Sequence, residues 1–238
     1  MAKFTTETYI LKRDILTFVR KITHTLRLPE RKFITDMIYG LLAAESCKLS
    51  DISDALHEKI KKKNTIERLS KNLAKGVPME AWKFYLHMIK KWEDNPVIHI
   101  DDTDVSKEYG KKFEAIGRVR DGSASGNKNI YKNGYYITEG TVLTKSFHPI
   151  SFFSKVHSSH EKDYISANAI TFAAIERGAK LFKKAMFVMD RGYDDNKMFL
   201  MLDKLGQHYI IRLTRNRKLL LGNGKWAKAS EMCARRKG

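Results

Sequence analysis

Two short apolar runs in this sequence end directly in acidic residues. Residues 97–100 are followed by Asp101, Asp102 and Asp104, and residues 186–189 are followed by Asp190. Carboxylates at the carboxyl ends of buried strands lie where α/β sheets build their sites, and burying them without compensation is costly. A divalent cation such as Mg²⁺, or Mn²⁺ in its place, is the natural compensation, because it takes oxygen ligands from carboxylates and substrate phosphate. This pattern favours metal-dependent phosphoryl transfer.

Side chains alternate between the two faces of a strand, and this separates the acids of the first cluster. Asp102 shares one face of its strand with Ile98 and Ile100, whereas Asp101 lies on the other face. We therefore favour Asp102 as the metal ligand. The alternative is that Asp101, Asp102 and Asp104 form only a turn at the strand end, because aspartate caps turns through its own side chain.

The apolar pattern after Pro96 predicts the elements that would position these acids. Residues 103–134 hold several glycines and many charges, and we expect them to form an extended loop. Three strands followed by alternating helices and strands is the order of the RNase H-like fold, so the prediction is an α/β chain with a mixed sheet. The predicted strands are residues 97–100, 135–143, 150–156, 185–189 and 208–213, with helices over residues 164–182 and 194–205.

Apolar residues recur at helical spacing over residues 9–92, which predicts a helical bundle ahead of the sheet. Within it we expect two short helices, one starting near Ser50 and one capped by Asn64 or Thr65. A basic turn between them would suit a helix-turn-helix reader of DNA, although a solvated charged face explains the same residues. The basic residues of this segment include Lys59, Lys61, Lys62, Lys63, Arg68, Lys71 and Lys75.

The charge balance points to a polyanionic partner. Among 238 residues, 45 are Lys or Arg and 27 are Asp or Glu, which gives a net charge of +18. Nucleic acid is the default partner for such a chain. No stretch approaches the roughly 18 apolar residues of a membrane span, and the start lacks the apolar core of a secretion signal, so we expect a cytoplasmic protein without a membrane partner. Cys47 and Cys233 support neither a disulfide framework nor a zinc finger.

Three segments resemble the DDE transposases of bacterial insertion sequences, in particular the insertion-sequence-four-like group. They are Asp-Asp-Thr-Asp at residues 101–104, Ile-Gly-Arg-Val-Arg-Asp-Gly-Ser at 116–123 and Met-Asp-Arg-Gly-Tyr-Asp at 189–194. Residues 208–217 look like the segment that follows the second aspartate in that group. The resemblance covers most of the chain from Pro96 to Arg217, and the helical N-terminal part fits as the family's end-binding region.

The resemblance implies that Asp102 is the first catalytic acid and Asp190 the second, and that both hold Mg²⁺ or Mn²⁺. In this family a glutamate within a Tyr-Arg-Glu-Lys type motif completes the site after an inserted β-rich region. Glu231 lacks that context, so we assign it no catalytic role and expect the third acid beyond Gly238. The candidates for DNA contact outside the basic helices are Arg120, Arg191, Arg212 and Arg215, any of which could equally be a surface arginine.

The resulting organisation has three parts. Residues 1–95 are expected to bind transposon ends, residues 96–217 to form the first part of an RNase H-like catalytic core, and residues 218–238 to begin the inserted region. We expect His157 and His160, which lack further zinc ligands, in a loop between strand and helix, and Glu176 as an exposed helix residue.

The leading hypothesis is a DNA transposase that cuts transposon ends with metal-activated water and joins the freed 3′-hydroxyl to target DNA. It would bind double-stranded terminal inverted repeats and target DNA as a homodimer in a synaptic complex, at the bacterial nucleoid. A truncated, inactive DNA-binding remnant or inhibitor of transposition is the alternative that the missing glutamate motivates. A weaker alternative is an RNA-binding or general nuclease domain.

Overall fold

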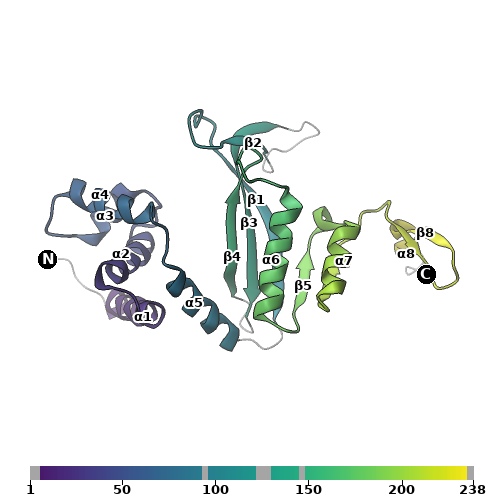
Figure 1. Ribbon diagram of the computed structural model, residues 1–238, viewed down its shortest axis with the longest axis horizontal. Coiled ribbons are helices and arrows are strands. Elements are labelled where there is room, and N and C mark those ends of the chain that lie inside the picture. Colours follow the sequence, from purple (N-terminus) through teal and green to yellow (C-terminus); the bar gives the residue numbers. More distant parts are fainter. Residues whose placement is uncertain (1–5, 93–95, 122–129, 145–147, 235–238) are drawn as a thin grey trace. The chain divides into compact units, whose positions relative to one another are not determined.

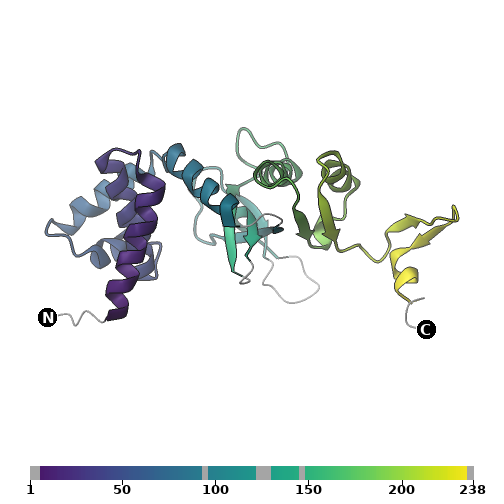
Figure 2. The same ribbon diagram turned by 90° about the horizontal axis from the view of Figure 1, so that it is seen from below.

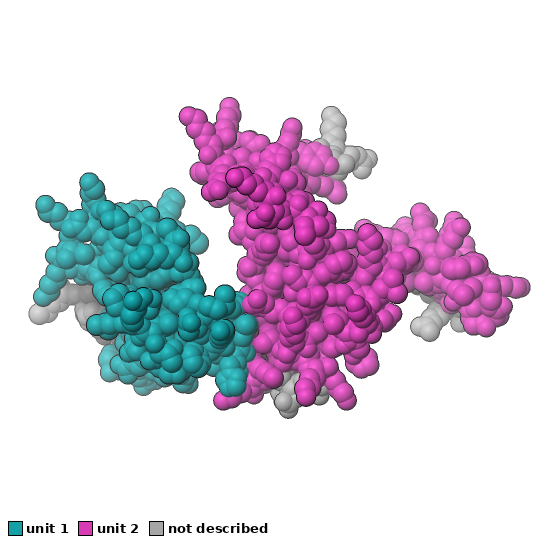
Figure 3. All heavy atoms as spheres, viewed as in Figure 1, with its two compact units in different colours: residues 1–88 teal, residues 89–238 magenta. Residues whose placement is uncertain are grey.

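The computed structural model describes residues 6–92, 96–121, 130–144 and 148–234. The chain divides into two compact units, Met1–Met88 and Ile89–Gly238, which Figure 3 shows in different colours. Within the described ranges, no helix combines the length and the apolar character needed to cross a membrane. Helices and strands together make an α/β chain with an N-terminal helical region, as predicted.

The first unit is a bundle of helices (Figure 1). Its apolar residues at helical spacing meet in one core, in which Val19, Ile52 and Leu69 are almost completely buried. This confirms the predicted bundle. The helices described are α1 (Thr6–Thr23), α2 (Leu28–Ala44), α3 (Leu49–Leu56), α4 (Lys62–Leu73) and α5 (Met79–Trp92), the last of which runs on into the second unit.

The start of α4 differs from the prediction. The helix begins at Lys62 with Lys61 at its N-cap, so the expected caps Asn64 and Thr65 lie inside the first turn. Thr65 is buried, and its hydroxyl donates to the Glu58 carboxylate over 2.8 Å instead of capping the helix. The basic residues expected in a turn are therefore partly helical.

The second unit is built on a mixed sheet of six described strands. Its order is β2-β3-β1-β5-β6, with β4 also paired to β3. Strands β1 to β4 pair in antiparallel fashion, whereas β1, β5 and β6 run parallel to one another. The strands are β1 (Val97–Ser106), β2 (Gly117–Arg120), β3 (Tyr131–Leu143), β4 (Pro149–His157), β5 (Met186–Met189) and β6 (His208–Ile211).

The predicted loop over residues 103–134 is only partly right. Strand β1 continues to Ser106, β2 lies inside the expected loop, and β3 begins at Tyr131. One glycine of this segment marks close strand packing, because a Cβ on Gly134 would come within 2.4 Å of the Val105 carbonyl oxygen. Residues 122–129 of the expected loop lie outside the described residues.

Two helices cover one face of the sheet, α6 (Ala167–Leu181) and α7 (Asn196–Lys204). Figures 1 and 2 show both on the same side of the strands. The Ser166 hydroxyl caps α6 by accepting from the Ala169 amide. Gly178 lets α6 approach closely, since a Cβ there would lie 3.0 Å from Ile98 and 3.1 Å from Phe187, both fully buried. The predicted helices and strands of this region are confirmed to within a few residues.

The last described elements follow β6. Strands β7 (Lys218–Leu220) and β8 (Trp226–Lys228) form a small antiparallel hairpin, followed by the short helix α8 (Ala229–Ala234). Gly224 has a positive φ of 75° in the connecting turn, a conformation that favours glycine.

Candidate functional site

The parallel pairing of β1 with β5 brings the two predicted acidic segments together. β1 was expected to end at its acids but continues to Ser106, so Asp101 and Asp102 lie within the strand, beside the point where β5 ends. His99 is the register partner of Val188 in this ladder. Continuing the register by two residues sets Asp101 level with Asp190, and Asp102 is one residue further along β1. The register therefore places Asp101, Asp102 and Asp190, here called the acidic edge, near one another beside the end of β5.

Asp101 shows how closely the acids gather. Burial raises the pKa of the Asp101 carboxyl, and the negative charges of Asp190 and Asp102 raise it further, against the lowering effect of a hydrogen bond from the Asp102 amide. That amide donates to the Asp101 Oδ1 atom over 2.9 Å. Asp101 thus lies within electrostatic range of both Asp190 and Asp102, and a cation near them would lower this repulsion.

Asp102 is half-buried and is held by the neighbouring strand. Thr138 is its register partner on β3, and the Thr138 Oγ1 atom donates to Asp102 Oδ1 over 2.6 Å. Thr138 Oγ1 also lies 2.9 Å from Nε2 of His157, and both of these side chains are buried. The His157 ring stacks with Tyr136 and Tyr164, at centroid distances of 6.0 and 6.2 Å. Burial lowers the pKa of this imidazole.

Asp190 begins the short 3-10 helix η1 (Arg191–Tyr193), and its carboxylate accepts from the Gly192 amide. Tyr193 at the end of η1 is buried, and no described residue forms a hydrogen bond of ordinary geometry with its hydroxyl. The pKa of the Tyr193 phenol is raised, first by burial and then by the charges of Asp102, Asp101 and Asp190. The hydroxyl therefore lies near all three carboxylates, with only a weak contact to Asp102.

The next residue, Asp194, fastens the segment after β6 to this edge. Its carboxylate accepts from both the amide and the hydroxyl of Thr214 over 2.8 Å. The Arg217 guanidinium lies 3.3 Å from the other Asp194 oxygen and also contacts the ring of Phe199. These contacts fix the path of the chain between Arg212 and Arg217.

The acids suit a hard divalent cation whose coordination shell is completed by oxygen atoms of water and substrate. Among the described residues, no three His, Cys, Asp or Glu side chains form a group able to hold a metal ion by themselves. Mg²⁺ usually needs only one or two carboxylates, because water and substrate phosphate supply its other oxygen ligands. Asp102 and Asp190 provide such a set, with Asp101 beside them. His157 is engaged with Thr138 and is not part of it.

The predicted arginines fall into two groups. Arg191 adjoins Asp190, and the Arg212 amide donates to the Met189 carbonyl over 3.4 Å, so both exposed side chains start beside the acidic edge. Arg215 is exposed on the segment that Asp194 fastens. Arg120 is exposed on β2, which β3 separates from β1.

The predicted basic residues of the first unit also differ in their surroundings. Lys61, Lys62 and Lys63 are exposed at the start of α4, where Lys62 pairs with Asp54. Lys71 is exposed and pairs with Glu67 on the same helix over 2.8 Å.

Arg68, in contrast, lies in an ion-pair network inside the first unit. Its guanidinium lies 2.8 Å from both Asp36 and Glu58, and Lys32 contacts the same two carboxylates. The pKa of Glu58 is lowered to about 2, because hydrogen bonds from Lys32, Arg68 and Thr65 outweigh the opposing effect of burial. Because its guanidinium is already paired with two carboxylates, a structural role for Arg68 is favoured over the predicted DNA contact.

Three residues of the acidic edge were missed by the sequence analysis. Thr138 occupies the same phase of β3 as the buried Val142, so a polar residue at a buried position was the available signal. His157 ends β4 and is buried, whereas a loop position was expected for it. Tyr193 lies within the recognised Asp-Arg-Gly-Tyr segment but was given no role.

Glu176 is exposed on α6, as predicted.

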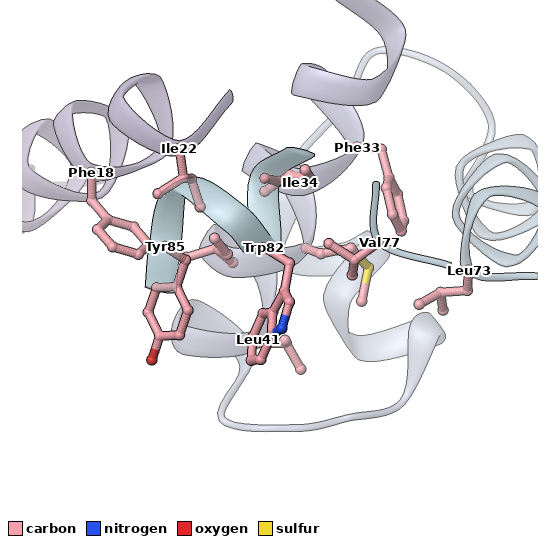
Figure 4. Close-up of a pocket in the computed structure, with 12 residues that line it drawn as sticks. Phe18, Ile22, Phe33, Ile34, Leu41, Leu73, Val77, Trp82 and Tyr85 are labelled. Carbon is pink, nitrogen blue, oxygen red and sulfur yellow. The ribbon is translucent and has the colours of Figure 1, made fainter. Parts of the chain in front are cut away.

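The first unit contains a separate apolar pocket. It is a cavity of about 390 Å³ lined by apolar and aromatic side chains. Figure 4 shows Trp82 and Tyr85 of α5 together with Phe18 and Leu41 around it. No charged residue lines this cavity, so it has no group suited to phosphoryl transfer.

The sequence matches no protein-family model and no curated protein. Among solved structures, the fold is similar to a chain in the cryo-EM structure of a piggyBac transposase synaptic complex with hairpin DNA. The identity is 9% and the TM-score 0.44; the match covers 87% of this chain and 49% of that chain, so this chain spans about half its length. A likeness of this size is too weak to assign a function.

Proposed function

We propose that this chain contains end-binding and catalytic residues of a DDE-type DNA transposase of an insertion sequence, which cuts and joins DNA with Mg²⁺ or Mn²⁺. One observation carries the proposal: β1 and β5 are parallel neighbours, and where β5 ends Asp101 lies within electrostatic range of both Asp102 and Asp190. A divalent cation would offset the repulsion between these carboxylates, and a net charge of +18 favours a polyanionic partner.

The chain's own residues would bind and orient the DNA strand. Asp102 and Asp190 would hold the metal ion, which when bound lowers the pKa of water and stabilises the charge on the phosphate. Arg191 and Arg212 begin beside Asp190 and would contact phosphate oxygens of the strand. The Tyr193 ring is buried and would keep water from the side of the carboxylates that it covers.

The first unit would bind the terminal inverted repeats. Lys61 and Lys63 at the exposed start of α4 are the side chains that we assign to phosphate contact. Two copies of the chain would bring two ends together in a synaptic homodimer, as the resemblance implies. The protein would then act at the nucleoid.

A DNA-binding remnant or inhibitor is the second candidate function. It is favoured because no described glutamate joins Asp102 and Asp190 in a metal-binding group of three acids. Glu176 on α6 and Glu231 on α8 are exposed. Such a chain would bind DNA or another copy of the transposase without cutting.

Incubation of the purified chain with Mg²⁺ and plasmid DNA carrying the element's ends tests the proposal. Wild type and Asp190→Ala are compared, with Asp163→Ala at an exposed acid as the matched control. Nicking that is lost only in Asp190→Ala supports the transposase, and equal nicking by all three chains contradicts it. Tight DNA binding without nicking supports the remnant, and cutting without preference for element ends supports a general nuclease.

A further inference from the structure

We propose that His157 is a positioning residue that acts through Thr138 to orient the Asp102 carboxylate for metal binding. This inference rests on the proposed function, because it concerns the same metal site. Its basis is the unbroken contact from His157 Nε2 to Thr138 Oγ1, 2.9 Å, and from Thr138 Oγ1 to Asp102 Oδ1, 2.6 Å.

The proton positions in this chain follow from the donors available. The Asp102 carboxylate can only accept, so the single hydroxyl proton of Thr138 points to Asp102. The Thr138 oxygen must then accept from His157, which requires a proton on Nε2. The same hydrogen bond between Thr138 and Asp102 therefore fixes both the hydroxyl rotamer and the histidine tautomer.

The other ring nitrogen agrees with this assignment. Nδ1 of His157 is buried, and no described residue forms a hydrogen bond with it. A proton there would leave a buried N–H without a partner, which costs more than an unused lone pair. The stacked rings of Tyr136 and Tyr164 hold the imidazole plane in place. His157 is therefore neutral and rigid, with its one proton directed at Thr138.

The hydrogen bond from Thr138 fixes the orientation of the Asp102 carboxylate. Thr138 donates to Oδ1, which restricts rotation of the carboxylate and would present it to the cation in one orientation. Partners of this kind fix the orientation of metal ligands, and their removal commonly lowers metal affinity about 10- to 100-fold. Thr138 faces Asp102 directly across the β1–β3 ladder, so β3 and β4 supply the orientation while β1 supplies the ligand.

Manganese affinity, measured by electron paramagnetic resonance of free Mn²⁺ in titrations of the whole chain, tests the inference. Thr138→Val removes the hydroxyl with little change of shape, and Thr138→Ser restores it. His157→Phe removes the donor, and His157→Gln restores an N–H. We expect the first member of each pair to weaken Mn²⁺ binding about 10- to 100-fold and the second to stay within a few-fold of wild type.

Asp102→Asn separates the possible failures. If it weakens Mn²⁺ binding while Thr138→Val and His157→Phe do not, the positioning role is wrong and the metal site stands. If wild type binds no Mn²⁺, or Asp102→Asn binds it as wild type does, both the proposed metal site and the positioning role are wrong.

Nitrogen-15 NMR of the histidines gives a readout that needs no activity and no metal. We expect a resonance of a neutral ring, protonated at Nε2, that is assigned to His157 by its loss in His157→Gln. The same ring should lose its fixed tautomer in Thr138→Val. A proton on Nδ1 in wild type, or no change in Thr138→Val, would overturn the inference.

Discussion

Thr138 lies directly opposite Asp102 in the antiparallel β1–β3 ladder, and its hydroxyl donates to the Asp102 carboxylate over 2.6 Å. The sheet thus provides both the acid and the group that orients it. On the other side of β1, the parallel strand β5 brings Asp190 to the same edge. An antiparallel and a parallel ladder therefore flank β1, and the candidate site lies beside the end of β5.

The Tyr193 ring should matter for folding and its hydroxyl should not. The ring is buried, whereas the hydroxyl makes no hydrogen bond of ordinary geometry with the described residues. We expect Tyr193→Phe to change the free energy of unfolding by less than about 0.5 kcal/mol, and Tyr193→Ala to lower it by about 3–5 kcal/mol. Urea denaturation measures both. Tyr109→Ala, at a side chain that is 92% exposed, is the control, and a large loss in Tyr193→Phe would contradict the assignment.

The network around Glu58 should make the first unit sensitive to acid. The pKa of Glu58 is lowered from 4.5 to about 2 in the folded chain, so its stabilising contribution is complete above pH 4.5 and is lost as the pH falls through that range to about 2. We expect Glu58→Gln to cost about 1–2 kcal/mol at pH 7, after solvent screening is allowed for. The difference from wild type should shrink toward pH 2.

Far-UV circular dichroism of urea unfolding at several pH values gives this comparison. Glu67→Gln is the matched control, because Glu67 forms an exposed ion pair with Lys71 and should cost less than about 0.5 kcal/mol. A Glu58→Gln deficit that is the same at pH 7 and pH 3 would show that the carboxylate charge is not responsible.

Close packing of α6 predicts a cost for one added methyl group. A Cβ at Gly178 would meet Ile98 and Phe187 at 3.0 and 3.1 Å, and both side chains are fixed in the core. Although alanine favours helices, we expect Gly178→Ala to lower the free energy of unfolding by about 1–3 kcal/mol. Glu176→Ala on the exposed side of α6 should be close to neutral. Stabilisation by Gly178→Ala, measured by urea denaturation, would show that the helix can move away without cost.

The exposed start of α4 should contribute to the salt dependence of DNA binding. If Lys63 contacts one phosphate, Lys63→Gln lowers the slope of log affinity against log salt by about 0.9. Lys83→Gln, at an exposed lysine on α5, is the control and should leave the slope unchanged. Fluorescence anisotropy with duplex DNA over a range of NaCl concentrations measures both. Equal slopes for the two variants would remove the special role of α4.

The helices and strands were largely predictable because apolar residues recur in them at clear helical or strand spacing. The bundle and most strands after Pro96 follow from spacing alone, and the end of β5 just before Asp190 was placed correctly. Strand β2 was missed, and β1 runs past Asp102 to Ser106 instead of ending there. The segment over residues 103–134 was predicted less well, because glycine has no side chain to show its environment. Gly134 reads as a loop residue in sequence but allows strands to approach in the sheet.

The contacts that orient the site were beyond the sequence. Thr138 and His157 are distant from Asp102 along the chain. The β1–β3 register sets Thr138 opposite Asp102, and the β3–β4 register brings His157 beside Thr138. The same is true of Arg68, whose charge suggested DNA until its pairing with Asp36 and Glu58 was visible. Residue type predicts what a side chain can do, whereas the long-range partner decides which of these roles it takes.

If Asp102 and Asp190 hold one divalent cation, Fe²⁺ bound in its place should cut the nearest backbone when ascorbate and peroxide are added. Mass spectrometry of the fragments should show cuts beside residues 102 and 190 in wild type, both suppressed by excess Mg²⁺ and both lost in Asp190→Asn. Cuts elsewhere in the chain, no cuts, or cuts that persist in Asp190→Asn would contradict a shared metal site.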